Sequence, residues 1–172
     1  MSTSIYAFLS ASPFLFTEVL QRPAGEVGLY YMAVVAGITL GSWLASRMTM
    51  RLGIEGLLSA GAGLGMIGAG DLVVLDLWHA LSVSGVLAVM SLFALGAGIT
   101  SPVATSGAIS VDPERIGAAA GLYGCLQMSF GAFCTLLVGL WHDGSALPVA
   151  VVLLAAAATA QAAFFLARER AG

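Results

Sequence analysis

Residues 77–111 read LWHALSVSGVLAVMSLFALGAGITSPVATSGAISV and contain no Asp, Glu, Lys or Arg. A helix needs roughly 20 consecutive apolar residues to cross about 30 Å of hydrocarbon, at about 1.5 Å per residue. This run clears that length without a single formal charge. It therefore predicts a helix that spans a membrane.

Other charge-free runs surround this stretch, and most of the charged residues lie in the short gaps between them. Only 9% of the 172 residues are charged, whereas a soluble domain carries about 25%. No run alternates with period two, which argues against a β-barrel. The sequence thus predicts an all-α integral membrane protein with a single six-helix domain over 1–172. The expected helices cover about 4–20, 26–46, 54–75, 80–107, 116–140 and 145–167.

The six basic residues are all arginines and are placed asymmetrically. Five of them fall in gaps that lie on one side of a six-helix protein: Arg47, Arg51, Arg115, Arg168 and Arg170. Arg22 stands alone on the other side. Because loops rich in basic residues stay in the cytoplasm, we expect both termini to be cytoplasmic and the protein to lie in the inner (plasma) membrane.

The sequence offers no catalytic or metal-binding pattern. It has no Walker A motif, no HExxH, no CxxC and no Gly-x-Ser-x-Gly, and both histidines lie at segment ends. No Asp is expected to be buried, which excludes intramembrane aspartyl chemistry. Cys125 and Cys134 are nine residues apart and point to opposite faces of one helix. We therefore expect no enzyme activity, no cofactor and no metal, and the absence of a basic tract predicts no nucleic-acid partner.

Uncharged polar residues form stripes on three of the expected helices. Tyr6, Ser10, Pro13 and Thr17 share a stripe on the first, Ser84, Ser91, Gly98 and Thr105 on the fourth, and Tyr123, Gln127 and Gly131 on the fifth. A proline at 13 predicts a kink, and the sequence Thr-Ser-Pro at 100–102 predicts a break. The amide of Gln127 is costly in mid-span unless it meets a partner or water. It either lines a cavity or makes an interhelical hydrogen bond.

The 22 glycines also fall into helical patterns. The repeated spacings are those of Gly37 with Gly41, of Gly61, Gly65 and Gly68, and of Gly117, Gly121 and Gly124. In lipid, close contact at small residues supplies much of the packing energy between helices. These faces predict close helix packing, and some of them could alternatively slide during a conformational change.

Several short motifs resemble one known family. YAFLSASPF at 6–14 resembles the seventh helix of the drug:proton antiporters of the major facilitator superfamily, in the bicyclomycin and chloramphenicol resistance branch. GSWLASR at 41–47, followed by RLG at 51–53, resembles the cytoplasmic loop motif between helices 8 and 9. The segments 98–102, 112–121, 126–128 and 140–144 resemble the passage from helix 10 to helix 11 and its continuation. Ala45 departs from the pattern, because an aspartate is common there, and this weakens any gating salt bridge at that loop.

The resemblance implies the C-terminal half of a twelve-helix transporter, namely helices 7–12, with the chain starting partway through helix 7. It implies a multidrug efflux activity by alternating access, coupled to protons. The implied substrate-cavity residues are Tyr6, Ser10, Pro13, Tyr31, Ser91, Tyr123 and Gln127, and the implied loop-motif residues are Gly41, Arg47 and Arg51. The expected partners are the lipid bilayer, a drug-like small molecule, and an N-terminal six-helix half or a second copy of the chain. The alternative function is a non-transporting membrane subunit that binds partner helices through its glycine-rich faces.

Overall fold

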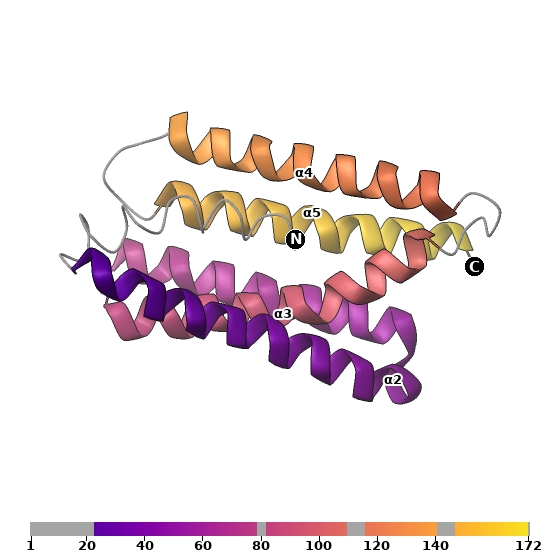
Figure 1. Ribbon diagram of the computed structural model, residues 1–172, viewed down its shortest axis with the longest axis horizontal. Helices are drawn as coiled ribbons and strands as arrows, with labels where there is room; N and C mark the ends of the chain where they lie inside the picture. The colour runs from indigo at the N-terminus through magenta and orange to yellow at the C-terminus, as the bar shows by residue number, and fades with distance from the viewer. Residues whose placement is uncertain (1–22, 79–81, 110–115, 141–146, 172) are drawn as a thin grey trace.

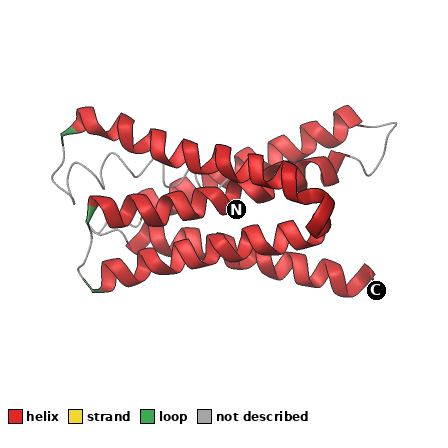
Figure 2. Ribbon diagram, turned by 90° about the horizontal axis from the view of Figure 1, so that it is seen from below, coloured by secondary structure: helices red, strands yellow, loops and turns green. Residues whose placement is uncertain are grey.

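The computed structural model describes residues 23–78, 82–109, 116–140 and 147–171. This part of the chain is helical throughout, with a short 3-10 turn η3 (Ala24–Glu26) and the helices α2 (Val27–Leu77), α3 (Val83–Ile109), α4 (Ile116–Leu140) and α5 (Leu147–Ala171). All of these helices run along the same long axis (Figure 2). The predicted all-α class is confirmed for these residues. The predicted helix 4–20 lies outside them, so a six-helix count is not established.

Helix α2 is a hairpin of two arms, 27–52 and 54–77. A straight helix of 51 residues would be about 76 Å long, far more than a bilayer. The chain instead reverses at Gly53, whose φ of 68° and ψ of 173° leave the helical region. Figure 1 shows the two arms running back alongside each other from the turn at the α2 label. This conformation is almost restricted to glycine.

The predicted helix boundaries need one correction around this turn. We expected a loop over 47–53, but the first arm stays helical through residue 52, and Gly53 is the only residue within α2 with non-helical dihedrals. The arginines at 47 and 51 therefore extend from helix and not from a loop. The expected boundaries of the other described helices lie within a few residues of those in the structure, although α5 continues to Ala171 instead of ending near 167.

Three helices in the described residues are long and apolar enough to cross a membrane, namely α2, α3 as far as Gly107, and α4. The part of α5 from Leu147 to Ala162 is a shorter apolar stretch. Each arm of α2 has the length of a separate span, at about 36–39 Å. The two arms of α2 and the helices α3, α4 and α5 thus run along the long axis in alternating directions (Figure 1).

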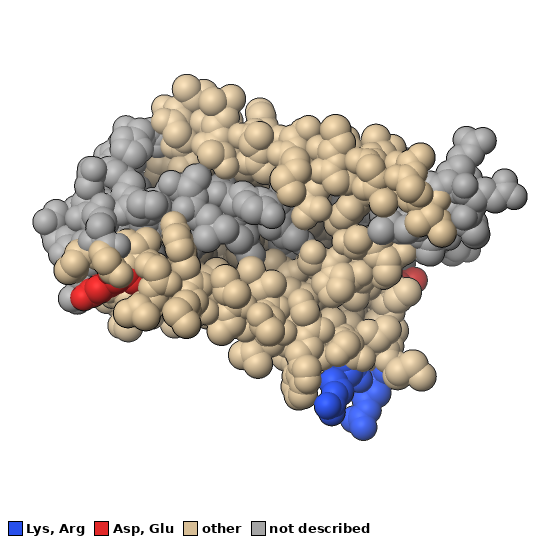
Figure 3. Space-filling model, in the orientation of Figure 1, with Lys and Arg blue, Asp and Glu red and all other residues tan. Residues whose placement is uncertain are grey.

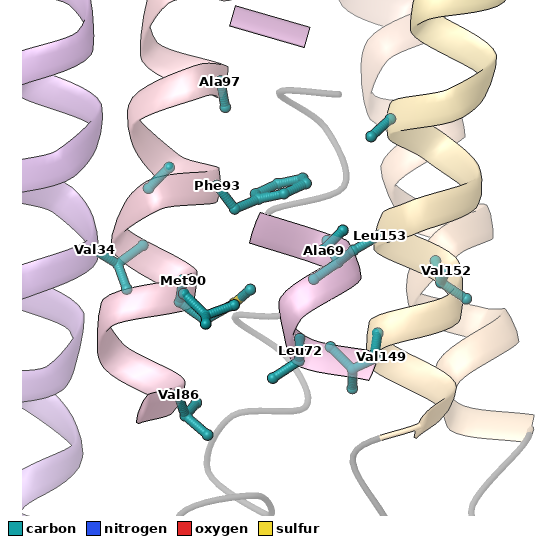
Figure 4. Packing of buried hydrophobic residues seen from close by; sticks show 14 of the residues in the cluster. Val34, Ala69, Leu72, Val86, Met90, Phe93, Ala97, Val149, Val152 and Leu153 are labelled. Carbon is teal, nitrogen blue, oxygen red and sulfur yellow. The ribbon is translucent and has the colours of Figure 1, made fainter. Parts of the chain in front are cut away.

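The core forms around α3, which packs between the two arms of α2 (Figure 4). Phe93 of α3 is 1% exposed and projects toward the second arm, where it meets the region of Ala69. Leu153 of α5 reaches the same region from the other side. A second, smaller cluster near the Gly53 turn contains Ala45, Leu57, Ile99 and Val103.

Glycines allow α3 to approach both arms. A Cβ added at Gly61 would lie 2.7 Å from Thr100 Cγ2 and 2.8 Å from the Gly96 carbonyl oxygen. A Cβ at Gly37 would lie 2.8 Å from the Ser91 carbonyl oxygen, and one at Gly68 would lie 3.0 Å from the Phe93 nitrogen. The predicted close packing at the glycine faces of 37–41 and 61–68 is therefore confirmed. Both faces pack against the same helix.

The glycine face of α4 behaves differently. Gly117, Gly121 and Gly124 have no atom within 4 Å of an added Cβ, other than those of their own helix and chain neighbours. Helix α4 is also the least buried of the apolar helices, and large side chains such as Leu122, Leu126 and Phe133 are exposed along it. Among the described residues, the predicted close packing of this third glycine face is wrong.

Formal charges lie toward the two ends of the long axis. The described arginine side chains, Arg47 and Arg51, form one blue surface at the turn end of α2 (Figure 3). Glu26, Asp71 and Asp76 belong to the opposite end, where the first arm begins and the second arm ends, whereas Glu55 lies two residues after Gly53, at the same end as the arginines. This distribution leaves the middle of the described helices without a formal charge. It matches the profile of a bilayer, with its apolar centre between two polar surfaces.

Candidate functional site

The candidate cavity residues on α4 are joined to α3 by a hydrogen bond. A hydrogen bond of 3.2 Å joins Thr105 Oγ1 and Tyr123 Oη, and the Thr105 hydroxyl also donates to the carbonyl of Ser101 in its own helix at 2.8 Å. Both side chains are half-buried. The Tyr123 hydroxyl is thus engaged with α3.

Gln127 follows Tyr123 by four residues and therefore lies on the same face of α4, one turn further on. It is half-buried, and it is placed near the middle of Ile116–Leu140. A primary amide at this depth has two donors and an acceptor for a ligand or a partner helix. Of the predicted cavity residues in the described ranges, Tyr123 and Gln127 lie on one face of one helix, and their lining of a cavity stays a prediction.

Tyr31 and Ser91 lie elsewhere. Tyr31 lines a shallow groove of about 590 Å³ along the first arm of α2, together with Gly28, Met32, Val35, Ala36, Thr39 and Leu40. Ser91 is half-buried in α3 at the crossing with Gly37. Its position is that of a packing contact between helices. The predicted residues Tyr6, Ser10 and Pro13 lie outside the described residues.

The three loop-motif residues take separate roles. Gly41 is buried in the first arm of α2, where an added Cβ would collide with the Leu95 carbonyl oxygen of α3. Arg47 stacks over the Trp43 ring, with its guanidinium carbon 4.9 Å from the ring centroid, a favourable cation–π contact. Arg51 is exposed beside the Gly53 turn. Gly41 is thus a packing residue, while the two arginines mark the charged end.

The surroundings of Ala45 give a reason for alanine at this position, where the motif that the sequence resembles commonly has an aspartate. It is 2% exposed and packs in an apolar cluster with Leu57, Ile99 and Val103. A carboxylate there would be buried without water, which is costly unless it is paired. Alanine suits this packing, and an aspartate would not.

The structure shows two features that the sequence analysis missed, namely the burial of Asp76 and a hydrogen bond made by Ser42. Asp76 is 7% exposed at the end of α2, so the prediction that no Asp is buried is wrong. Sequence reasoning placed it in a gap because the helix was expected to end at 75. The other is Ser42, whose hydroxyl donates to the Gly98 carbonyl of α3 at 3.1 Å. The sequence feature that could have pointed to this bond is Pro102, which has no backbone N–H for the carbonyl of Gly98, four residues earlier.

An apolar groove of about 600 Å³ lies between α4 and α5. It is lined by Phe130, Phe133, Cys134, Leu137, Leu140, Val151, Val152, Ala155, Ala156 and Thr159. The size is that of a ligand pocket, but such pockets also carry a few convergent polar groups that orient the ligand. This lining offers only a hydroxyl and a thiol. It suits hydrocarbon better than a drug that must be held in one orientation.

Metal binding finds no support in the described ranges, where no group of three or more His, Cys, Asp or Glu side chains comes together. Cys125 is exposed and Cys134 is buried, and both thiols are free. This difference agrees with their predicted positions on opposite faces of one helix.

The chain is similar to a protein that is named for drug resistance. It is 27% identical over 154 residues to the chloramphenicol resistance protein of Pseudomonas aeruginosa. The match covers 88% of this chain and 36% of the relative, so the chain spans about a third of the relative's length. No family model matches the chain, and no solved structure matches it. The apolar helices and this weak homology together suggest a membrane protein related to drug resistance.

Proposed function

We propose that this chain acts as the C-terminal six-helix half of a drug:proton antiporter of the major facilitator superfamily, in the bicyclomycin and chloramphenicol resistance branch. The observation that carries the proposal is the similarity to a chloramphenicol resistance protein over 88% of the chain. The described helices support it, because three of them are long and apolar enough to cross a membrane. Transport of this kind needs neither a catalytic side chain nor a cofactor.

In this proposal one wall of the substrate path is formed by α3 and α4. Tyr123 and Gln127 supply an aromatic ring and an uncharged amide on one face of α4, which suits a moderately apolar drug. The described helices provide no opposing wall for this face, since α4 is largely exposed. Alternating access requires two halves that rock against each other around a site near the midplane. The chain therefore works with an N-terminal half or with a second copy of itself.

The test is to measure chloramphenicol accumulation in a drug-sensitive bacterium. The chain is produced alone, or together with the part of the Pseudomonas aeruginosa relative that the match leaves out. We expect lowered accumulation only with both parts present, abolished by a proton uncoupler. If both parts reach the membrane and accumulation stays unchanged, the proposal is wrong. Lowered accumulation with the chain alone would favour a complex of identical copies.

A variant at the cavity face sharpens this test. Gln127→Ala, tested with both parts present, should reduce export about 10-fold or more. The drug would lose its hydrogen bond to the amide, which contributes about 1.5 kcal/mol. Leu126→Ala is the matched control, because Leu126 is the neighbouring residue and is 62% exposed. Export by Gln127→Ala at the level of the Leu126→Ala control would remove this residue from the cavity.

The alternative function, a non-transporting subunit that binds partner helices through glycine faces, is favoured by one observation. The face of Gly117, Gly121 and Gly124 is open among the described residues, whereas the other two glycine faces are occupied by α3. Gly121→Leu separates the alternatives. Under the subunit hypothesis it should abolish co-purification of a partner chain, and under the transporter hypothesis it should impair export only when both parts are present.

A further inference from the structure

Helix α3 contains a proline in its interior. Pro102 lies within the unbroken helix Val83–Ile109, so the predicted break at 100–102 is absent. In an α-helix the backbone N–H of each residue bonds the carbonyl four residues earlier. Proline has no N–H, so Pro102 leaves the carbonyl of Gly98 without its helical partner. In an apolar environment a missing backbone hydrogen bond is expensive.

The partner for this carbonyl comes from another helix. The Ser42 hydroxyl, on the first arm of α2, donates to the Gly98 carbonyl oxygen at 3.1 Å. Two glycines make the contact possible. An added Cβ at Gly98 would collide with the Ile38 carbonyl, and one at Gly41 would collide with the Leu95 carbonyl. Ser42 therefore replaces the hydrogen bond that Pro102 removes.

The surroundings of α3 change at the same point. Before the proline, Phe93, Ala97 and Thr100 are between 1% and 7% exposed. After it, Ser106 and Gly107 are exposed. Figure 1 shows the final part of α3 turning away from α2 and rising toward α4. Val103 is still buried, in the cluster with Ala45, Leu57 and Ile99, so the tightly packed part of the helix ends at residue 103 and the loosely packed part follows it.

The loosely packed part is attached to α4. The Thr105 hydroxyl, one turn beyond Pro102, bonds Tyr123 Oη at 3.2 Å. Tyr123 lies in the first third of Ile116–Leu140, the helix with the least buried face. A movement of α3 beyond the proline would therefore be transmitted to the beginning of α4.

We propose that residues 98–103 of α3 form a hinge, that the Ser42 hydroxyl holds this hinge in its bent state, and that 104–109 moves together with the start of α4 through the Thr105–Tyr123 bond. Prolines and freed carbonyls are established sites of helix bending. The hinge does not depend on drug transport. Its test measures helix positions, so a failure of the transport assay leaves it standing.

The test uses pairs of spin labels and measures their distance in lipid nanodiscs. Met50→Cys, on the exposed end of the first arm of α2 (93% exposed), is paired with Ser106→Cys beyond the hinge or with Ala88→Cys before it. The background carries Cys125→Ala and Cys134→Ala. Ser42→Ala should broaden and shift the 50–106 distance and leave the 50–88 distance unchanged. Ser42→Thr keeps the hydroxyl and should resemble the parent.

A second variant, at the proline, separates a hinge from ordinary packing. Pro102→Ala restores the backbone N–H, so the Gly98 carbonyl regains its helical partner and no longer needs Ser42. The effect of Ser42→Ala on the 50–106 distance should then disappear in the Pro102→Ala background. The hinge proposal fails if Ser42→Ala changes nothing, or if its effect is equally large in the Pro102→Ala background and in the parent.

The link to α4 is tested with a third label pair. Ala118→Cys, exposed at the start of α4, is paired with Met50→Cys. Ser42→Ala should shift the 50–118 distance along with the 50–106 distance. Tyr123→Phe removes the phenol oxygen and with it the bond to Thr105. In the Tyr123→Phe protein, Ser42→Ala should therefore shift the 50–106 distance but not the 50–118 distance. A 50–118 distance that ignores Ser42→Ala, or that still follows it in the Tyr123→Phe protein, overturns the coupling.

Discussion

Gly61 and Gly63 are two residues apart on the same arm of α2, and their surroundings are opposite. An added Cβ at Gly61 would meet Thr100 and the backbone of Gly96 at 2.7–2.8 Å, whereas one at Gly63 has no neighbour within 4 Å. Thr100 cannot easily move away, since its hydroxyl bonds the carbonyls of Gly96 and Ala97. A glycine is thus required at one position and merely tolerated at the other.

This contrast predicts opposite effects of the same substitution. Gly61→Ala should lower the free energy of unfolding by about 1–3 kcal/mol, as overpacked sites do. Gly63→Ala should raise it by up to about 1 kcal/mol, because alanine favours the helix. The measurement is reversible unfolding in detergent micelles, followed by circular dichroism. Equal stability of the two variants would show that α3 does not pack against this arm as described.

At the level of a single helix, the turn of α2 depends on one backbone conformation. Gly53 has a φ of 68° and no neighbour within 4 Å of an added Cβ, so any cost of a side chain there comes from backbone strain and not from a clash. The two arms reverse direction within this one residue. Without the reversal, α3 could not contact both arms.

Gly53→Ala should therefore cost about 1–3 kcal/mol, the usual range for a strained backbone position. Gly70→Ala is the control, since Gly70 also has open space around it but lies within regular helix. The same unfolding measurement compares the two variants. A Gly53→Ala protein as stable as Gly70→Ala would mean that the turn tolerates an ordinary residue.

Across the molecule as a whole, the helix ends lie at the two ends of the long axis (Figure 1). The Gly53 turn, with Arg47 and Arg51, lies at the end of the molecule where α3 finishes and α4 begins (Figure 1). Helix α5 runs back to this same end, so the C-terminal end of α5 and the described arginines lie on one side. Basic residues favour the cytoplasmic side.

A topology reporter checks this orientation. Green fluorescent protein fused after Gly172 should fluoresce, and alkaline phosphatase fused there should be inactive, because we expect this end in the cytoplasm. Alkaline phosphatase fused after Trp78, at the opposite end of α2, should be active. Phosphatase activity after Gly172 would reverse the proposed orientation while leaving the helical fold intact.

The amino-acid sequence was sufficient to predict that the described chain is helical and apolar, although not that the first arm of α2 stays helical through residue 52. Long charge-free runs suffice for this, because an apolar helix satisfies its own backbone hydrogen bonds whatever surrounds it. The gaps between runs and the placement of arginine were equally visible. Tyr123 and Gln127 were predicted to share a face for the same reason, since helical periodicity fixes their relation within one element.

Which helices touch one another could be learned only from the folded molecule. The three glycine faces look alike in the sequence, yet two pack on α3 and the third, at 117–124, is open among the described residues. Likewise, the sequence places Pro102 four residues after Gly98, but it does not show that Ser42, 56 residues away, donates a hydrogen bond to the Gly98 carbonyl. Contacts of this kind depend on how distant segments cross in space, and periodicity within a single helix carries no information about that crossing.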